Sequence, residues 1–203
     1  MKDINNRNDK LKKKVFELPD AEITLYENLF TVSESDRLFK SLVETIEWQQ
    51  EQVKLYGKTF DLPRLTAWYG DKAYTYSGII MNPLPWNEDL LFIKNKIEQE
   101  AGVKFSSCLL NYYRNGKDSV SWHQDDEKEL GRNPIIASVS FGETRPFQLK
   151  HLFKEELDKV DIPLTHGSFL LMQGTTQHFW KHQIPKTSKE IKPRINLTFR
   201  VIK

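Results

Sequence analysis

One short segment, residues 122–127, places an imidazole and carboxylates close together in the chain. If it is a strand, His123 and Asp125 share one face, because side chains two residues apart point to the same side. A second imidazole would complete the set of two histidines and one carboxylate that binds Fe(II) and leaves positions open for other ligands. His182, just before an Ile-Pro pair, is the natural third ligand. These residues predict an iron site.

Two arginines near the C-terminal end of the sequence form a second pattern that suits an anion. Period-two alternation places Arg194, Asn196, Thr198 and Arg200 on one face of a strand. An ordinary solvent-exposed face would explain this polar set. An inward face would instead suit a ligand with two carboxylates, because guanidinium groups pair bidentately with carboxylates. A His-x-Asp pair alone is a weak signal, and together with the distal histidine and this arginine pair it is far more specific.

His178 and His182 offer a competing metal site. Separated by four residues on a helix, two histidines can bind zinc, as in the HExxH motif. The glutamate that this motif requires after its first histidine is missing, because Phe179 occupies that place, and Pro185 soon ends any helix. We therefore favour iron over a zinc hydrolase.

Two helices are expected ahead of these motifs. Ser33 and Asp36 resemble a capping pair, and apolar residues then recur at helical spacing over 38–46. The second helix is expected to start at Asn87 and to end at Gly102. The tract between them, about residues 50–86, is rich in Gly, Pro and Tyr and predicts hairpins and loops.

From Phe105 onward the pattern changes to short strands, each bounded by Gly, Pro, Asn or charged residues. The candidate strands are residues 106–113, 119–125, 134–142, 146–151, 166–173 and 194–202. Many short strands at this spacing indicate a sandwich or barrel. The expected fold class is therefore α+β, built around one all-β core.

Composition narrows the class of protein. The 203 residues fit one domain, and 12 Phe, 7 Tyr and 5 Trp argue against a disordered chain. No apolar run is long enough for a membrane span or a signal peptide, so no membrane partner is expected. The single cysteine, Cys108, excludes an internal disulfide framework and a thiolate-rich zinc site, and it favours an intracellular location.

Charge is concentrated at the start of the chain. Residues 1–14 hold six basic side chains against Asp3 and Asp9, although the whole sequence has a formal net charge of only +2. Residues 1–18 are therefore expected to form a flexible basic arm, ahead of one domain over residues 19–203. Such an arm either attracts nucleic-acid phosphates or is simply a solvated tail.

The sequence from about residue 20 onward resembles the AlkB family of Fe(II)- and 2-oxoglutarate-dependent dioxygenases, of the type of the second and third human AlkB homologues. The basic arm is not covered. The resemblance rests on the segments PRLTAWYG (63–70), YTYSG (74–78), residues 109–142, LTHGSFLLMQG (164–174), WKHQIP (180–185) and PRINLTFR (193–200).

The resemblance implies a double-stranded β-helix, or jelly-roll, core over residues 105–203, with N-terminal helices and a nucleotide-recognition lid of hairpins at about 50–86. It assigns Fe(II) to His123, Asp125 and His182, with O2 and 2-oxoglutarate as cosubstrates. The residues that it places on 2-oxoglutarate are Asn111, Tyr113, Arg194, Asn196 and Arg200. Of the two arginines, Arg194 would bind the distal carboxylate and Arg200 would lie nearer the keto-acid end.

The implied activity is direct-reversal DNA repair. Hydroxylation of an N-alkyl group gives a hemiaminal, which releases formaldehyde and the repaired base, of the 1-methyladenine or 3-methylcytosine type. The damaged base would be turned out of the stack. The resemblance places Tyr74 and Tyr76 on one face of the base and His123 on the other, with Asp126 and Glu127 reading the base. Packing of both tyrosines in the core is the alternative.

A hairpin tip in the irregular tract adds a prediction about duplex DNA. Tyr56, beside Lys58 and followed by Arg64, suits insertion into a base stack while the basic side chains contact phosphates. A surface tyrosine with ordinary basic neighbours is the alternative.

The sequence is also compatible with two other functions. They are a demethylase of RNA or of single strands from the same family and, less favoured, a non-catalytic nucleic-acid-binding jelly roll. The protein is expected to be a monomer whose partner is alkylated DNA. Its expected location is the cytoplasm if the source is a bacterium and the nucleus if it is a eukaryote.

Overall fold

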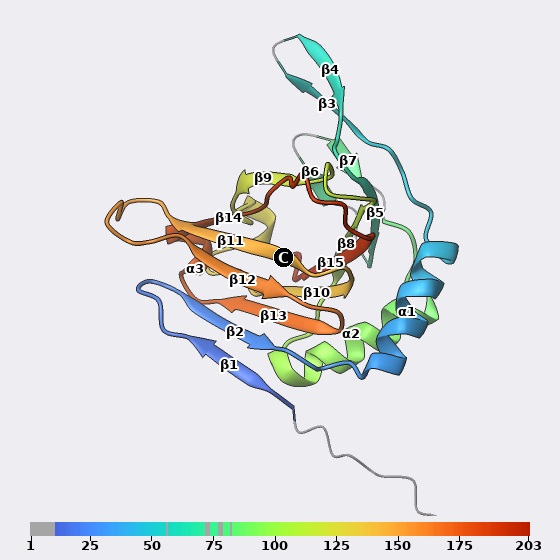
Figure 1. The fold of residues 1–203 in the computed structure, drawn as a ribbon, viewed down its shortest axis with the longest axis horizontal. Helices are drawn as coiled ribbons and strands as arrows, with labels where there is room; N and C mark the ends of the chain where they lie inside the picture. The colour runs from blue at the N-terminus through green and yellow to red at the C-terminus, as the bar shows by residue number, and fades with distance from the viewer. Residues whose placement is uncertain (1–10, 56, 72–73, 77–78, 82) are drawn as a thin grey trace, which may run out of the picture.

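Two antiparallel sheets form the body of the protein (Figure 1). The computed structural model describes residues 11–203 except 56, 72–73, 77–78 and 82. The larger sheet has seven strands, in the spatial order β1 (Lys13–Phe16), β2 (Glu22–Tyr26), β13 (Ser168–Gln173), β10 (Ile136–Gly142), β15 (Arg194–Arg200), β8 (Ser107–Tyr113) and β5 (Leu65–Gly70). The smaller sheet has four strands, in the order β12 (Val160–Leu164), β11 (Arg145–His151), β14 (Trp180–Ile184) and β9 (Val120–His123).

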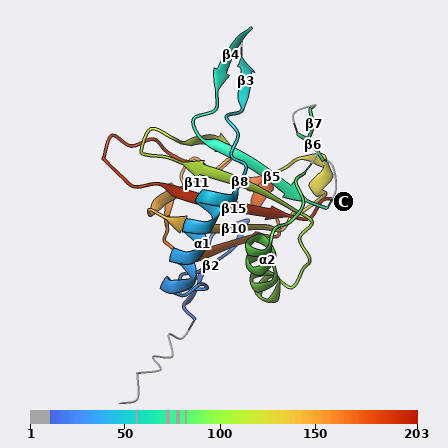
Figure 2. The ribbon, with the colours of Figure 1, turned by 90° about the vertical axis from the view of Figure 1, so that its right-hand side faces the viewer.

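Two helices cover the outer face of the larger sheet, α1 (Val32–Thr45) and α2 (Glu88–Ala101) (Figure 2). Their apolar residues form one buried cluster with the apolar side of the strands beneath them. That cluster includes Leu38, Leu42, Leu90, Ile93, Ile97, Ile195, Leu197 and Phe199. Because β15 alternates, its polar residues must point the other way, into the space between the two sheets. The predicted α+β class with a jelly-roll core is confirmed.

The ends of the helices follow from local hydrogen bonds. The second helix begins and ends as predicted, since the Asn87 side chain accepts from Leu90 N at 2.8 Å and Gly102 has φ 70°. The first helix starts earlier than the Ser33–Asp36 pair predicts. Its cap is Thr31, whose hydroxyl accepts from Glu34 N at 3.2 Å while Glu34 Oε2 accepts from Thr31 N at 2.8 Å. This reciprocal pair satisfies two backbone donors. Because the cap is Thr31, Ser33 lies inside the first turn of the helix.

The tract of residues 50–86 contains two hairpins, as expected. They are formed by β3 (Gln52–Leu55) with β4 (Lys58–Asp61) and by β6 (Tyr74–Tyr76) with β7 (Ile79–Met81). The β3–β4 hairpin projects away from the sheets (Figures 1 and 2). Strand β5, which lies between the hairpins in the chain, instead pairs with β8 at the edge of the larger sheet. The tract therefore contributes to the core as well as to the rim.

Each of the six expected strands corresponds to a strand of the structure, but other strands were not expected. The smaller sheet also contains β12 and β14, and β12 carries Pro163, which its position at the edge of the sheet tolerates. The expected arm of residues 1–18 is wrong for residues 13–16, which form β1 and pair with β2. Partly buried Phe16 and Leu18 pack on the cluster between the sheets, and this contact anchors the segment. Residues 1–10 lie outside the described residues.

Two short elements complete the structure, a 3-10 helix (Lys128–Leu130) and α3 (Thr176–Phe179). Nowhere in the described part of the chain is there a helix with the length and apolar character that a membrane crossing requires.

Candidate metal centre and cosubstrate cavity

The three predicted metal ligands lie together at one end of the smaller sheet. His123 is the last residue of β9 and stands opposite His182 of β14 in the strand register. Asp125 follows in the loop, so it reaches the centre from beyond the strand and not from the strand face that alternation predicts. Ligand atoms of all three side chains lie within 4.8 Å of one another. The sequence prediction of one His-Asp-His cluster is confirmed.

Hydrogen bonding sets the His123 ring for metal binding. Its Nδ1 lies 2.8 Å from the carbonyl oxygen of Ser121, a contact that requires a proton on Nδ1. The lone pair is then on Nε2, the atom that can coordinate an ion. A backbone partner of this kind is typical of metal-bound histidines.

Burial and charge set the protonation of the other two ligands. Burial, together with the neighbouring His123, lowers the pKa of His182 to about 3. Burial opposes ionisation of Asp125, but the positive charge of Arg200 and its hydrogen bond hold the pKa of this carboxyl well below its usual range. At neutral pH the centre therefore presents neutral imidazole and ionised carboxylate, the forms that ligate Fe(II). The donor set fits this ion.

Arg200 orients the ligand carboxylate. Its Nη2 donates to Asp125 Oδ1, and both side chains are buried. The second oxygen of Asp125 lies 3.6 Å from His182 Nε2. One carboxylate oxygen therefore faces the arginine while the other faces the histidine ligand.

A cavity of about 370 Å³ between the sheets extends from the metal ligands to Arg194. Its lining contains the whole polar face of β15, which excludes the solvent-exposed alternative for this strand. The predicted site residues that line it are His123, Asp125, His182, Asn111, Tyr113, Arg194, Asn196, Arg200, Glu127 and Arg64.

Arg194, at the far end of the cavity, is only partly satisfied. Its Nη2 donates to Ser140 Oγ at 2.9 Å, and its guanidinium carbon lies 5.2 Å from the centre of the Tyr113 ring. Within the described residues, its Nε and Nη1 are buried and have no hydrogen-bond partner. Burial, with the nearby charge of Arg145, lowers its pKa to about 10, so the group stays charged at neutral pH. Unpaired buried donors on a cation fit a carboxylate ligand.

Arg145 supports this end of the cavity from behind Tyr113. Its guanidinium carbon is 5.7 Å from the ring centre, on a side chain that is 2% exposed. Its Nη2 donates to the carbonyl oxygens of Asp118 at 3.0 Å and Pro185 at 2.6 Å. Tyr113 thus lies near two buried cations, in a region that favours an anion.

The amide side chains of the cavity already have protein partners. Asn196 Nδ2 donates to Ser138 Oγ at 2.8 Å and to Val139 O at 3.1 Å, so this residue mainly organises the wall. Asn111 Oδ1 accepts from Arg64 Nε at 2.7 Å, which leaves the Asn111 amide nitrogen for a ligand. The Arg64 side chain is therefore directed into the cavity, whereas the hairpin pattern placed it on nucleic acid.

The predicted base-reading residues have different placements. Glu127 lines the cavity, and its Oε2 is buried without a hydrogen-bond partner in the described part of the structure. Burial raises its pKa. Asp126 is exposed and lies outside the lining. The backbone of Tyr74 and Tyr76 forms β6, but their side chains lie outside the described residues.

Two further predictions concern the hairpin and the zinc alternative. Tyr56 lies outside the described residues, whereas Lys58 is exposed at the start of β4. His178 lies in the single turn α3, where its Nε2 is 2.8 Å from Asn133 Oδ1, and His182 lies in the next strand. The two histidines therefore do not share a helical face, and the zinc alternative is excluded.

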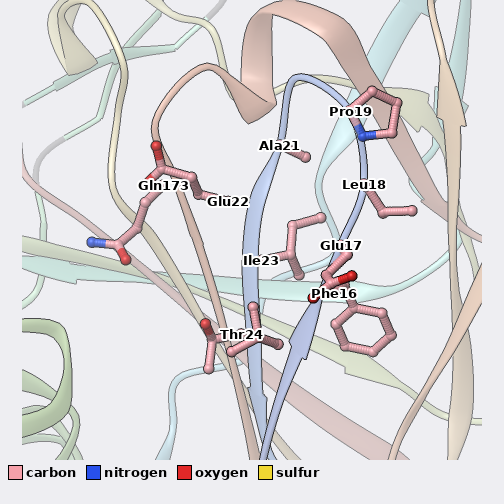
Figure 3. A pocket seen from close by; sticks show the side chains of 10 residues that line it. Phe16, Glu17, Leu18, Pro19, Ala21, Glu22, Ile23, Thr24 and Gln173 are labelled. Atoms are coloured by element: carbon pink, nitrogen blue, oxygen red, sulfur yellow. The ribbon is translucent and has the colours of Figure 1, made fainter.

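A larger hollow lies elsewhere, beside the turn that joins β1 and β2. This hollow has a volume of about 580 Å³. Figure 3 shows the side chains that line it, among them Phe16, Leu18, Ile23 and Gln173. Its ionisable side chains, Glu17 and Glu22, are not buried. Size alone would therefore misplace the site, and the smaller cavity carries the chemistry.

Facing antiparallel sheets, a His-Asp-His centre and a partly unpaired buried arginine define an Fe(II)- and 2-oxoglutarate-dependent oxygenase. A sequence model of the family described as the 2OG-Fe(II) oxygenase superfamily matches residues 22–200. The chain belongs to this superfamily and, within it, to the AlkB family.

The relatives agree with this assignment. Human alpha-ketoglutarate-dependent dioxygenase alkB homolog 3 is 45% identical over 190 residues, which cover 90% of this chain and 66% of the relative. Human DNA oxidative demethylase ALKBH2 is 38% identical over 190 residues, 87% of this chain and 72% of the relative. The chain thus spans slightly less than two thirds of the alkB homolog 3 sequence. The solved structure of OsALKBH1 shares the fold with a TM-score of 0.62 at 15% identity, covering 93% of this chain and 100% of that one.

Some residues that build the site have no distinctive sequence signal. Ser140 and Arg145 support Arg194 and Tyr113, and Gln177 contacts the loop that carries Asp125. A serine and a glutamine at unremarkable spacing do not indicate such roles. Arg145 directly precedes the expected strand of residues 146–151. Its sequence context indicates no role in the site unless the arginine is already known to be buried.

Proposed function

We propose that this protein removes N-alkyl groups from damaged bases in DNA by oxidation, with Fe(II), 2-oxoglutarate and O2. The observation that carries the proposal is the polarity of a single cavity. One end has the metal-ligand cluster, and the other end has Arg194 with two unpaired buried nitrogens among the described residues. The relatives named as DNA oxidative demethylases support the choice of substrate.

Each end of the cavity has its own task. Arg194 binds the distal carboxylate of 2-oxoglutarate, beside Tyr113, while the amide nitrogen of Asn111 supports the same ligand. Arg200 keeps Asp125 ionised and oriented, and it lies at the metal end, where the keto-acid group would bind. Asn196 holds Ser138 and Thr198 in the wall between them.

The chemistry at the metal end uses His123, Asp125 and His182 as ligands, and the structure favours the unprotonated forms of Asp125 and His182. Bound Fe(II) would supply the coupling of O2 reduction to decarboxylation of 2-oxoglutarate and hydroxylation of the N-alkyl carbon. The hydroxylated product then releases formaldehyde and leaves the unmodified base.

The cavity wall also suits a cationic base. Glu127 offers a buried carboxyl oxygen near the metal ligands, and a carboxylate complements the positive charge of 1-methyladenine or 3-methylcytosine. We place Tyr74 and Tyr76 of the β6–β7 hairpin on the face of the turned-out base and Asp126 at its exposed side. A base that pairs badly leaves the stack at a low free-energy cost, which favours damaged over normal bases.

Product release from defined oligonucleotides tests the activity. Formaldehyde and succinate are measured with single-stranded DNA, duplex DNA and RNA, each carrying 1-methyladenine or 3-methylcytosine, and with unmodified controls. We expect formaldehyde from the methylated DNA alone and none from the Asp125→Asn variant. Formaldehyde from RNA only would replace DNA with RNA as the substrate. Its absence from all methylated oligonucleotides would refute the proposal.

The projecting β3–β4 hairpin is proposed to contact duplex DNA, with Tyr56 entering the base stack and Lys58 near a phosphate. Loss of one stacked aromatic typically costs about 1 to 3 kcal/mol. We therefore expect Tyr56→Ala to lower activity on duplex DNA roughly 5- to 150-fold, with little change on a single strand. Thr59→Ala, at an exposed position of the same hairpin, is the matched control. Equal losses on both substrates would contradict the contact.

The protein is proposed to act as a monomer on nucleic acid. Sedimentation of the protein with and without oligonucleotide distinguishes a 1:1 complex from a dimer.

A further inference from the structure

One buried glutamine connects the two segments that carry the metal ligands. Gln177 lies in α3, ahead of the strand that contains His182, and its side chain is 1% exposed. Its Oε1 accepts a hydrogen bond from the backbone N–H of Asp125 at 2.9 Å. Its own carbonyl oxygen accepts from Gln124 Nε2 at 2.6 Å. Both residues that follow His123 are thus bonded to the same partner.

The need for this partner arises where β9 ends. His123 is the last residue of the strand, so the N–H of Asp125 is not in the strand ladder, although Asp125 is 2% exposed. A buried N–H group requires a hydrogen-bond acceptor. Gln177 supplies that acceptor from the segment that leads into His182. The same bond therefore satisfies the buried N–H group of the loop and sets the distance between the two segments that carry metal ligands.

Other contacts hold the glutamine side chain itself. Its Nε2 lies 3.5 Å from the sulfur of Met172, a residue of β13 in the larger sheet. Gln177 does not line the cavity, so it touches neither the place of the metal ion nor that of 2-oxoglutarate. Its effect on the metal centre must pass through Asp125.

We propose that Gln177 is a positioning residue of the metal centre, whose amide oxygen holds the Asp125 backbone at the distance from His182 that one metal ion requires. The inference rests on the metal centre of the proposed function, but it is independent of which nucleic acid is the substrate. Partners of metal ligands typically change metal affinity about 10- to 100-fold when they are removed.

Metal binding without substrate tests this role. Dissociation constants for Mn²⁺ are measured by calorimetry, and bound Co²⁺ is observed by visible absorption, which reports ligand geometry. Gln177→Met keeps the size of the side chain and removes the acceptor oxygen. We expect its Mn²⁺ dissociation constant to rise roughly 10- to 100-fold and the Co²⁺ spectrum to change. His178→Ala, at the exposed neighbouring position, should retain both wild-type values.

A conservative variant separates positioning from general packing. Gln177→Glu keeps an oxygen at the acceptor position and should restore the wild-type Co²⁺ spectrum. A lower melting temperature of Gln177→Met with unchanged metal affinity and spectrum would overturn the proposal, because Gln177 would then act only in packing. If Gln177→Met does not fold, Gln177→Asn keeps a side-chain amide but shortens it, which withdraws the acceptor oxygen from the Asp125 N–H. This variant should also raise the dissociation constant, and an unchanged value would overturn the proposal.

The outcomes also distinguish the two proposals. Wild-type protein that binds Mn²⁺, with binding lost in Asp125→Asn, supports the metal centre whatever Gln177 does. A wild-type protein that binds no divalent ion would overturn both the metal centre and the role of Gln177.

Discussion

The two ends of β15 carry the same side chain in opposite situations. Arg200, at the metal end, donates to the buried carboxylate of Asp125. Arg194, at the other end, is 1% exposed and forms no ion pair within the described part of the chain. A buried cation without a counter-ion is costly, so such a group indicates an anion supplied from outside. The arginine at the metal end thus has its counter-ion within the protein, whereas the arginine at the distal end has room for an anionic ligand.

The largest effect is expected when the ion pair at the metal end is removed. Asp125→Ala removes a metal ligand and leaves Arg200 buried without its carboxylate. We expect no detectable turnover, and a loss of about 3–5 kcal/mol in the free energy of unfolding of the metal-free protein. Urea denaturation measures the second effect. Asp126→Ala, at the exposed neighbouring position, is the control and should leave stability near the wild-type value.

The opposite signature is expected at the distal end. Arg194→Met removes the unpaired cation, so 2-oxoglutarate binding should weaken by about 2–5 kcal/mol, or roughly 30- to 4,000-fold. The metal-free protein should keep its stability or gain some, because an apolar side chain replaces a partly unpaired buried charge. Calorimetric titration with 2-oxoglutarate and urea denaturation give the two values. A large loss of stability together with unchanged affinity would remove the contrast between the two arginines.

A smaller effect is expected at Glu127, which lines the cavity near the metal end and which we propose to act on the base. Glu127→Gln should lower formaldehyde release by roughly 10- to 150-fold, because one hydrogen bond to a charged group contributes about 1.5–3 kcal/mol. Decarboxylation of 2-oxoglutarate without nucleic acid should change much less. Comparing succinate in the presence and absence of methylated oligonucleotide measures the difference. Equal losses would place Glu127 in support of the metal ligands.

The smallest effect concerns pH, and it again separates the two ends. The folded-state pKa of His182 is lowered to about 3, below the ordinary value of 6.5, so the unfolded chain binds the proton more readily. Stability of the metal-free protein should therefore fall as pH drops below about 6.5, by at most about 1.4 kcal/mol per pH unit from this group. Arg194 stays charged throughout and contributes no slope. Melting temperatures from pH 7 to 5 test this, and His182→Gln should flatten the slope.

Local chemistry explains how much of the molecule could be predicted. The alternation of residues 194–200 predicted both faces of β15, because the period of a strand is independent of its neighbours. Asn87 and Gly102 predicted a helix because caps act within one turn. By contrast, the five residues of β14 include tryptophan, lysine, histidine and glutamine, and β12 contains a proline. Neither segment therefore has the sequence pattern of an ordinary strand. Their pairing with β11 defines them as strands.

The site follows the same division. The metal ligands were predictable because their chemistry is restrictive and two of them are neighbours in the chain. Gln177 was not, since its partner Asp125 lies 52 residues away and the register of the smaller sheet brings them together. Arg64 was assigned to nucleic acid by its basic neighbours, while its bond to Asn111, 47 residues away, directs it inward.

The position of β15 also bears on how the larger sheet is completed during synthesis. This strand follows every other strand in the chain, yet it lies between β10 and β8 in the larger sheet. A nascent chain that still lacks it has two open strand edges, which are prone to pair with other chains. Closure depends on contacts between distant residues and is therefore slow. The same event protects both edges and brings in both arginines, so a growing polypeptide loses its exposed strand edges and gains the two cations of the cavity together.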